Sequence, residues 1–155
     1  MPRTPAAARS TLDRGPLTQL VGYALRRAQV AVLRDFDRTM AGLPVPLSLG
    51  EFGMLVLIER NPDLSQTALA RAIGLDRSTL VPILDRLERD GLVTRKPAPR
   101  DRRRHALALG RRGARLMAGY VAAVGRHDKR VRHGLSPRES VQLMRLLDRL
   151  CEGAR

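Results

Sequence analysis

The sequence has very few aromatic residues and a single cysteine. It contains no tryptophan, two tyrosines, two phenylalanines and one cysteine among 155 residues. A core that is poor in aromatic rings has to be built from leucine, valine, alanine and isoleucine, a composition that favours helices. Cys151 cannot close a disulfide within the chain, which agrees with a reducing compartment. We expect Cys151 to be buried or to lie at an interface between subunits.

Further absences limit the class of protein. No apolar run approaches the ~20 residues that a bilayer span needs, and the basic start of the chain lacks the apolar stretch of a signal peptide. We therefore expect a cytoplasmic protein. The histidines have no metal-site spacing and no glycine-rich phosphate loop is present, so an enzyme is disfavoured and no cofactor or metal is expected. We expect His127, Asp128 and His133 to be exposed polar positions.

Positive charge is what the chain has in excess. Lysine and arginine number 29 against 15 aspartates and glutamates, which gives a formal net charge of +14. This charge repels itself in a compact molecule and is best neutralised by a polyanion. Double-stranded DNA or another nucleic acid is therefore the leading partner, an anionic membrane the second, and an acidic protein or coenzyme the third.

Helical periodicity and turn residues divide the chain into four segments. Residues 1–16 predict a disordered basic arm, with a role in holding DNA or a partner subunit as the alternative. Residues 17–47 predict a long first helix ended by glycine and prolines. Residues 48–110 predict three helices and a β-hairpin, and residues 111–155 predict two more helices. The fold class is thus mainly α with one small hairpin.

Capping residues mark the predicted helix starts. Serine, aspartate and glutamate at these positions can accept from amides that have no partner inside a helix. The predicted caps are Ser48 with Glu51, Ser65, Asp76, and Ser136 with Glu139. Gly74 is the left-handed residue expected after the short helix that follows Ser65. Strands at residues 92–96 and 106–109 then flank an arginine-rich tip at residues 100–104.

Two short helices with a tight turn, followed by a basic hairpin, are the layout of a winged helix-turn-helix. The second helix is expected to enter a major groove, where its side chains can reach bases and phosphates. Its candidate residues are Arg77, Ser78, Thr79 and Arg86. The arginines of the tip can enter a narrow minor groove, with Asp101 orienting one of them. These arginines are Arg100, Arg102, Arg103 and Arg104. Solvated charged surfaces are the alternative.

Residues 64–109 resemble the MarR family of bacterial transcription regulators. The matching stretches are Leu-Ser-Gln-Thr-Ala-Leu-Ala-Arg-Ala-Ile-Gly-Leu, Asp-Arg-Ser-Thr-Leu-Val-Pro-Ile-Leu-Asp-Arg-Leu-Glu-Arg-Asp-Gly-Leu-Val and Arg-Asp-Arg-Arg. The family's wing signature, D-x-R and then L-T, is matched by Asp101, Arg103 and Leu109. The chain departs from it at Gly110, where a threonine would cap the next helix.

The resemblance implies a symmetric homodimer built by the helices at both ends of the chain. Two recognition helices would occupy successive major grooves of a palindromic operator, with each wing in the flanking minor groove, and repression is the commonest mode. The residues at the family's DNA-contacting positions are Arg77, Ser78, Thr79, Pro82, Asp101 and Arg103. Ser65 and Gln66 start the preceding helix and are placed to meet phosphate.

An effector is also implied, because many MarR-type proteins leave DNA when a small aromatic anion binds. Residues 22–29, Gly-Tyr-Ala-Leu-Arg-Arg-Ala-Gln, resemble a subgroup that controls aromatic-acid breakdown and responds to hydroxycinnamoyl-CoA thioesters such as p-coumaroyl-CoA. Tyr23 can stack on an aromatic acyl group, and arginines of the first helix can bind the phosphates of CoA. These arginines are Arg26, Arg27, Arg34 and Arg38. The alternative is that they are solvated or paired with Asp35 and Asp37, and that Tyr23 belongs to the core.

One other class of DNA-binding protein remains open. Charge alone gives affinity without sequence information, so an architectural or non-specific DNA-binding protein is the alternative. The ordered caps and core stripes favour a reader with a defined shape. A thiol sensor is disfavoured because Cys151 lies on the last helix, away from the expected sensing position.

Overall fold

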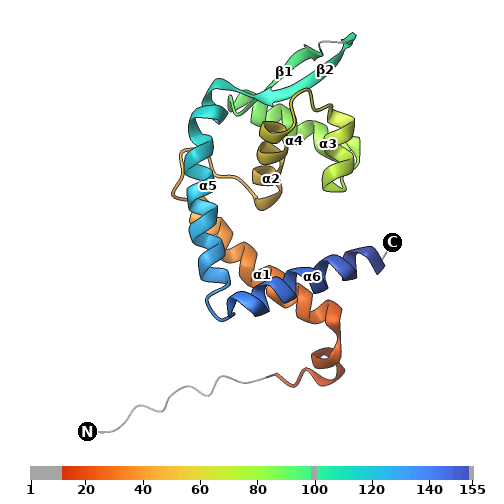
Figure 1. Ribbon diagram of the computed structural model, residues 1–155, viewed down its shortest axis with the longest axis vertical. Coiled ribbons are helices and arrows are strands. Elements are labelled where there is room, and N and C mark those ends of the chain that lie inside the picture. The colour runs from red at the N-terminus through yellow and green to blue at the C-terminus, as the bar shows by residue number, and fades with distance from the viewer. Residues whose placement is uncertain (1–11, 99–100, 154–155) are drawn as a thin grey trace, which may run out of the picture.

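The computed structural model describes the backbone of residues 12–98 and 101–153, and the side chains of residues 12–96 and 106–153. A lobe of short helices and a hairpin lies at one end, and α5 runs from it to the other end, where α1 and α6 lie (Figure 1). The elements are η1 Gly15–Gln19, α1 Val21–Met40, α2 Leu49–Arg60, α3 Gln66–Ile73, α4 Arg77–Arg89, β1 Val93–Ala98, β2 Asp101–Leu109, α5 Arg111–Val131 and α6 Pro137–Gly153. The prediction of a mainly helical fold with one small hairpin is confirmed.

The beginning of the first helix differs from the prediction. Residues Gly15–Gln19 form a 3-10 helix, and Leu20 is extended, so that α1 begins at Val21 and not at residue 17. Pro16 fits the first turn of this short helix because its missing amide has no partner there. Most of the predicted basic arm, residues 1–11, lies outside the described residues. The division of the chain at residues 16, 47 and 110 stays a prediction.

One hydrophobic core joins the lobe to α1 and α5. Leucines of α2, α3, α4 and the hairpin form its centre, among them Leu55, Leu69, Leu84 and Leu107, none more than 1% exposed. Phe36 and Met40 bring the end of α1 into this core, and Met117 and Tyr120 bring α5 into it. The hydroxyl of Tyr120 donates to the carbonyl of Val45 at 2.9 Å. The lobe is therefore fixed to the long helices by shared core packing.

The hairpin is antiparallel and irregular near its tip. The register runs from Val93 opposite Leu109 to Pro97 opposite His105, and then shifts so that Ala98 faces Asp101. We expected residues 100–104 to form the tip, and this was wrong for four of them, because β2 already begins at Asp101. Beyond the shift, β2 has more residues than β1, and residues 99–100 between the strands lie outside the described part of the chain.

The first turn of α5 rests on the backbone of the turn after α4. The amide of Gly110 donates to Leu92 O at 2.9 Å, and the amide of Gly113 to Gly91 O at 3.2 Å. A Cβ on Gly110 would lie 2.9 Å from the carbonyl carbon of Gly91 and closer still to its oxygen. Neighbouring carbonyls therefore take the place of a side-chain cap, and this packing leaves no room for the threonine of the wing signature.

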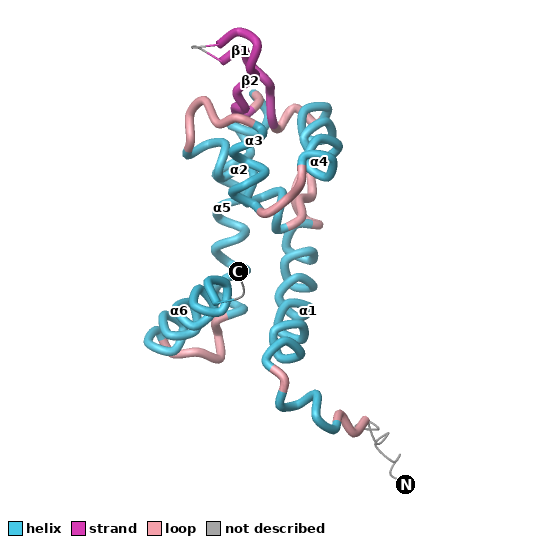
Figure 2. Tube along the Cα trace, turned by 90° about the vertical axis from the view of Figure 1, so that its right-hand side faces the viewer, coloured by secondary structure: helices cyan, strands magenta, loops and turns pink. Residues whose placement is uncertain are grey.

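The two ends of the chain leave apolar side chains uncovered. Figure 2 shows α1 and α6 apart, although they cross in the view of Figure 1. Within α6, Ser140 is the one buried residue. The large exposed apolar residues near the N-terminus are Leu12, Leu17, Leu20, Val21 and Leu25, and those toward the C-terminus are Val131, Leu135, Val141, Leu143, Met144, Leu146 and Leu150. Exposed apolar residues that gather on the same elements are typical of a protein interface. In the part of the chain that is described, no helix has the length and apolar character to cross a bilayer.

Candidate nucleic-acid interface

The first turn of α4 presents three of the predicted DNA-contacting residues to solvent. Arg77, Ser78 and Thr79 are exposed. Asp76 caps the helix: its carboxylate accepts from the Thr79 amide at 2.8 Å, the Ser78 hydroxyl at 2.6 Å and the Thr79 hydroxyl at 3.0 Å. The hydrogen bond from Ser78 and then those from Thr79 lower the pKa of Asp76 to about 2. The cap thus holds both hydroxyls in place, and Arg77, which precedes them in the sequence, is exposed.

Arg86, also predicted to contact DNA, is held by the protein itself. Its guanidinium pairs with Glu51 of the α2 capping box and, at 3.2 Å, with Asp90. Burial raises the pKa of Glu51, but hydrogen bonds from Ser48 and Arg86 outweigh this and lower it. Arg86 therefore ties α4 to the start of α2. Pro82 is exposed on α4.

The start of α3 lies against the wing. The Ser65 hydroxyl accepts from the Ala68 amide at 3.1 Å, which confirms the predicted cap. Ser65 also forms an isolated β-bridge with Ala106 of β2, and the Leu107 amide donates to Leu64 O at 2.8 Å. Ser65 and Gln66 are both half-buried at this helix start. Their contact with phosphate stays a prediction.

The predicted minor-groove residues have only their backbone described. Arg100 lies outside the described residues. The backbone of Asp101, Arg102, Arg103 and Arg104 belongs to β2, and their side chains lie outside the described part of the chain. The roles of these five residues in DNA binding stay predictions. The base of the wing is described and is held to α4 by ion pairs from Arg95.

The candidate effector residues form one row along α1. At 3.6 residues per turn and a rise of 1.5 Å per residue, Tyr23, Arg27, Arg34 and Arg38 fall within roughly 60° of one another and extend over about 22 Å. Arg26 lies beside this row. Tyr23 is half-buried and the four arginines are exposed. A ligand that touches both ends of the row has to be elongated.

Two of these arginines already have local partners. Arg26 donates to Gln29 at 3.4 Å, and Arg38 pairs with Asp35 at 3.3 Å. The Arg38 side chain is nevertheless 78% exposed, so this ion pair is weak and can be exchanged for another anion. The pairing of Arg38 with Asp35 is thus compatible with a role of Arg38 in binding an effector.

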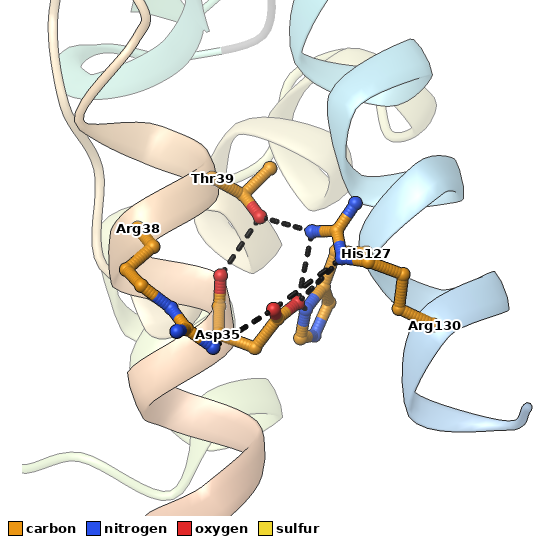
Figure 3. Close-up of polar contacts among 5 residues, drawn as sticks. All are labelled: Asp35, Arg38, Thr39, His127 and Arg130. Atoms are coloured by element: carbon orange, nitrogen blue, oxygen red, sulfur yellow. Dashed lines mark hydrogen bonds and ion pairs between the residues drawn. The ribbon is translucent and has the colours of Figure 1, made fainter.

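Next to this row, a cluster of polar side chains joins α1 to α5 (Figure 3). His127 Nδ1 lies 2.8 Å from Asp35 Oδ2, and Arg130 donates to Asp35 Oδ2 at 2.8 Å and to the Thr39 hydroxyl at 2.6 Å. These bonds, those from Arg130 first, lower the pKa of Asp35 to about 2. The His127 ring stands edge-on to the Phe36 ring, with centroids 5.3 Å apart.

The expectation that His127 is exposed was wrong. His127 is 4% exposed, whereas His133 is exposed and Asp128 is half-buried and pairs with Arg132. A sequence signal was available, because His127 continues the buried stripe of α5 formed by Met117, Tyr120 and Ala123. Among the described residues, no group of three or more histidines, cysteines, aspartates or glutamates is placed to hold a metal ion.

Cys151 is exposed on α6 within the single chain. The expectation of a buried cysteine is therefore wrong for the isolated chain, while a place at a subunit interface stays a prediction. The residue lies next to Leu150, one of the uncovered apolar residues of α6.

An exposed recognition helix, a hairpin wing and uncovered apolar ends define the class of winged-helix transcription factors. The model of the MarR family matches residues 47–105. A protein described as a transcriptional regulatory protein for the hcr operon of Thauera aromatica is 40% identical over 139 residues, which cover 90% of this chain and 83% of that protein. The chain therefore belongs to the MarR family, whose members are transcription regulators and not enzymes.

Solved structures of relatives agree with this assignment. The transcriptional repressor CouR bound to a 23-mer DNA duplex is 39% identical, with a TM-score of 0.80, and the match covers 94% of this chain and 100% of that one. CouR bound to p-coumaroyl-CoA is 35% identical, with a TM-score of 0.82, and the match covers 90% of this chain and 97% of that one.

Proposed function

We propose that the protein is a homodimeric transcriptional repressor that binds palindromic operator DNA and is released by an aromatic acyl-CoA thioester such as p-coumaroyl-CoA. The observation that carries the proposal is the exposed first turn of α4, where Asp76 holds Ser78 and Thr79 next to the exposed Arg77. The likeness to CouR structures with DNA and with p-coumaroyl-CoA supports it. Such a repressor acts on the chromosome, which places it in the cytoplasm.

The dimer follows from the uncovered ends of the chain. The apolar residues of η1, the start of α1 and α6 would be covered by the same surfaces of a second copy, as a two-fold interface requires. Residues 17–47 and 111–155 thus supply the dimer helices, and residues 48–110 supply the DNA-binding lobe. Two lobes related by a two-fold axis match a palindromic site.

The proposed DNA contacts follow from the placement of each element. Arg77, Ser78, Thr79 and Pro82 would face the major groove, and Ser65 and Gln66 a phosphate. The β2 residues Asp101, Arg102, Arg103 and Arg104 would serve the minor groove. We do not include Arg86 among the proposed DNA-contacting residues, because its guanidinium already pairs with two carboxylates.

Operator binding is expected to be specific and to depend on Arg77. In a fluorescence-anisotropy titration at physiological salt, DNA from upstream of the protein's own gene should bind ~10³-fold more tightly than random DNA. Arg77→Ala removes a bidentate donor to a base edge and should weaken operator binding by roughly 5- to 150-fold. Arg126→Ala, which removes the same charge from an exposed position on α5, is the matched control and should bind nearly as wild type.

Equal affinity of the wild type for operator and random DNA, with a steep dependence on salt, would contradict the proposal. Binding would then come from charge alone, and the architectural alternative would replace the repressor.

Release from the operator is expected to need the whole thioester. Because the row on α1 is about 22 Å long, p-coumaroyl-CoA should dissociate the complex, whereas free p-coumarate and CoA should act only at much higher concentration. Arg34→Gln removes a charged donor and should raise the half-maximal concentration by roughly tenfold or more. The measurement is the loss of anisotropy from labelled operator DNA as each compound is added.

Glu59→Gln, an exposed change of charge on α2, is a control that should leave the thioester response unaltered. A thioester that neither binds the protein nor releases DNA would discard the effector while leaving operator binding in place.

A further inference from the structure

Arg95 of β1 makes three hydrogen bonds to two carboxylates of α4. Its backbone amide donates to Glu88 Oε1 at 3.1 Å, its Nη1 donates to Glu88 Oε2, and its Nη2 donates to Asp85 Oδ1 at 2.6 Å. Asp85 and Glu88 are three residues apart on a helix and so lie on the same side of α4. The Arg95 side chain is 21% exposed, whereas the side chains of its partners Asp85 and Glu88 are 52% and 36% exposed.

Arg95 stands where the wing leaves the body of the lobe. Across the hairpin it pairs with Leu107, which is 1% exposed and belongs to the core. The next residue, Lys96, is exposed, and the register becomes irregular after Pro97. Arg95 is therefore a contact between α4 and the last regular part of the strand before the wing projects.

The chemistry of this contact fixes an angle as well as a distance. A guanidinium is planar, and its two terminal nitrogens here reach different carboxylates one helical turn apart. A lysine ammonium carries the same charge but cannot hold both partners in one plane. Ion pairing with Asp85 and Glu88 also outweighs the burial that lowers the pKa of Arg95, so its pKa is raised and the charge is retained.

The same contacts make Arg95 a poor phosphate ligand. Nη1 and Nη2 are both engaged, and its positive charge is met by two carboxylates on the helix that would enter the major groove. Arg95 therefore affects DNA binding indirectly, by holding the wing against α4.

We infer that Arg95 is a positioning residue that locks the wing to the recognition helix, so that reading of the flanking minor groove requires Arg95 whereas reading of the half-site by α4 does not. The inference rests on the proposed function, in which α4 and the wing contact different grooves. It assigns to Arg95 a role in specificity that is distinct from direct contact with DNA.

The test uses the full-length protein and three DNA duplexes: the operator, a duplex with altered flanks and one with an altered half-site. The wild type should prefer the operator over the altered flanks by about tenfold. Arg95→Met and Arg95→Lys should both bring this ratio close to one, while the preference for the correct half-site is kept. If Arg95→Lys also loses the preference for the operator flanks, the geometry of the guanidinium and not its positive charge is what the preference requires.

Lys96→Met is the matched control, because it removes the same charge from the neighbouring exposed position of β1. It should weaken binding to all three duplexes equally. Glu88→Gln, which keeps the Asp85 partner, should lose part of the flank preference, and its effect should not add to that of Arg95→Met. This variant also tests the inference if Arg95→Met fails to fold.

Two results would overturn the inference: an unchanged flank preference in Arg95→Met, or an equal loss on all duplexes with a salt slope reduced by about one, which marks a phosphate contact. A wild type that does not distinguish the operator from random DNA would instead overturn the proposed function, so the two failures are distinguishable.

Discussion

Replacement of Gly113 by alanine is expected to lower the free energy of unfolding by about 3 kcal/mol, the upper part of the range for overpacking. A Cβ at this position would lie 2.9 Å from the carbonyl carbon of Leu92 and closer still to its oxygen. The obstacle is backbone and cannot rotate away. Leu92 is fully buried, and its amide donates to Leu87 O at 2.9 Å, so the turn is held from the other side as well.

Urea and thermal unfolding measure this effect, and a loss of about 3 kcal/mol corresponds to roughly 10 °C in a chain of this size. Gly119→Ala is the control on the same helix. Beyond its own helical backbone, no atom lies within 4 Å of the added carbon, and alanine should stabilise the helix by up to about 1 kcal/mol. A Gly113→Ala variant as stable as wild type would mean that α5 does not rest on this turn.

The same substitution should weaken operator binding more than Gly119→Ala does. The contact of Gly110 and Gly113 with Gly91 and Leu92 joins α5 to the turn between recognition helix and wing. Any shift that accommodates the methyl group therefore changes how the lobe sits on the dimer helices. Operator affinity would then be reduced by the altered position of the lobe, although the DNA-contacting residues themselves are unchanged.

Local signals in the sequence were enough to predict most of the helices. The Ser48–Glu51 capping box, the Ser65 and Asp76 caps and the left-handed Gly74 are all present as expected. Each depends on residues within four positions of one another, so the chemistry is visible in the sequence. The recognition helix and its exposed first turn could be predicted for the same reason.

The deviations arise where distant parts of the chain meet. The missing cap of α5 is explained by carbonyls of the turn after α4, and Arg86 is occupied by Glu51, which is 35 residues away in the sequence. The wing tip was misplaced because the register shift of the hairpin depends on pairing and not on composition. The hydrophobic periodicity of a single helix does not reveal contacts with distant segments or the register of a hairpin.

His127 is the residue for which local and distant information disagreed most. Its position on the buried stripe of α5 can be seen in the sequence, but its partner Asp35 lies 92 residues away, and its charged sequence neighbours favour an exposed position. The effector row on α1 is the reverse case. Its periodicity is plain in the sequence, while binding of a ligand there stays a proposal.

Removal of the His127 ring is expected to cost about 2 kcal/mol of stability, from lost packing and an unpaired neighbour. His127→Ala loses the edge-on contact with Phe36 and the hydrogen bond to Asp35. His133→Ala, on an exposed position just after α5, is the control and should change stability by no more than about 0.5 kcal/mol. Equal effects of the two substitutions in urea unfolding would contradict the role of the cluster.

The pH dependence of unfolding tests the same cluster from its acid side. Asp35 has its pKa lowered from 3.8 to about 2 by Arg130 and His127, so the folded state binds the proton less readily than the unfolded state. Its contribution to stability is complete above pH 3.8 and is lost as the pH falls toward about 2. Asp76 titrates in the same range, so the wild-type curve contains both groups.

Asp35→Asn and Asp76→Asn separate the two contributions. Each variant should reduce the slope of stability against pH between 3.8 and about 2, and the two reductions should add because the groups lie in different parts of the molecule. Only Asp35→Asn should also weaken the link between α1 and α5 at neutral pH, since asparagine cannot balance the charge of Arg130. If Asp35→Asn kept the full acid slope, the carboxylate would not be paired in the folded protein. The junction of α1 with α5 would then rest on core packing and on the hydrogen bond from Arg130 to Thr39.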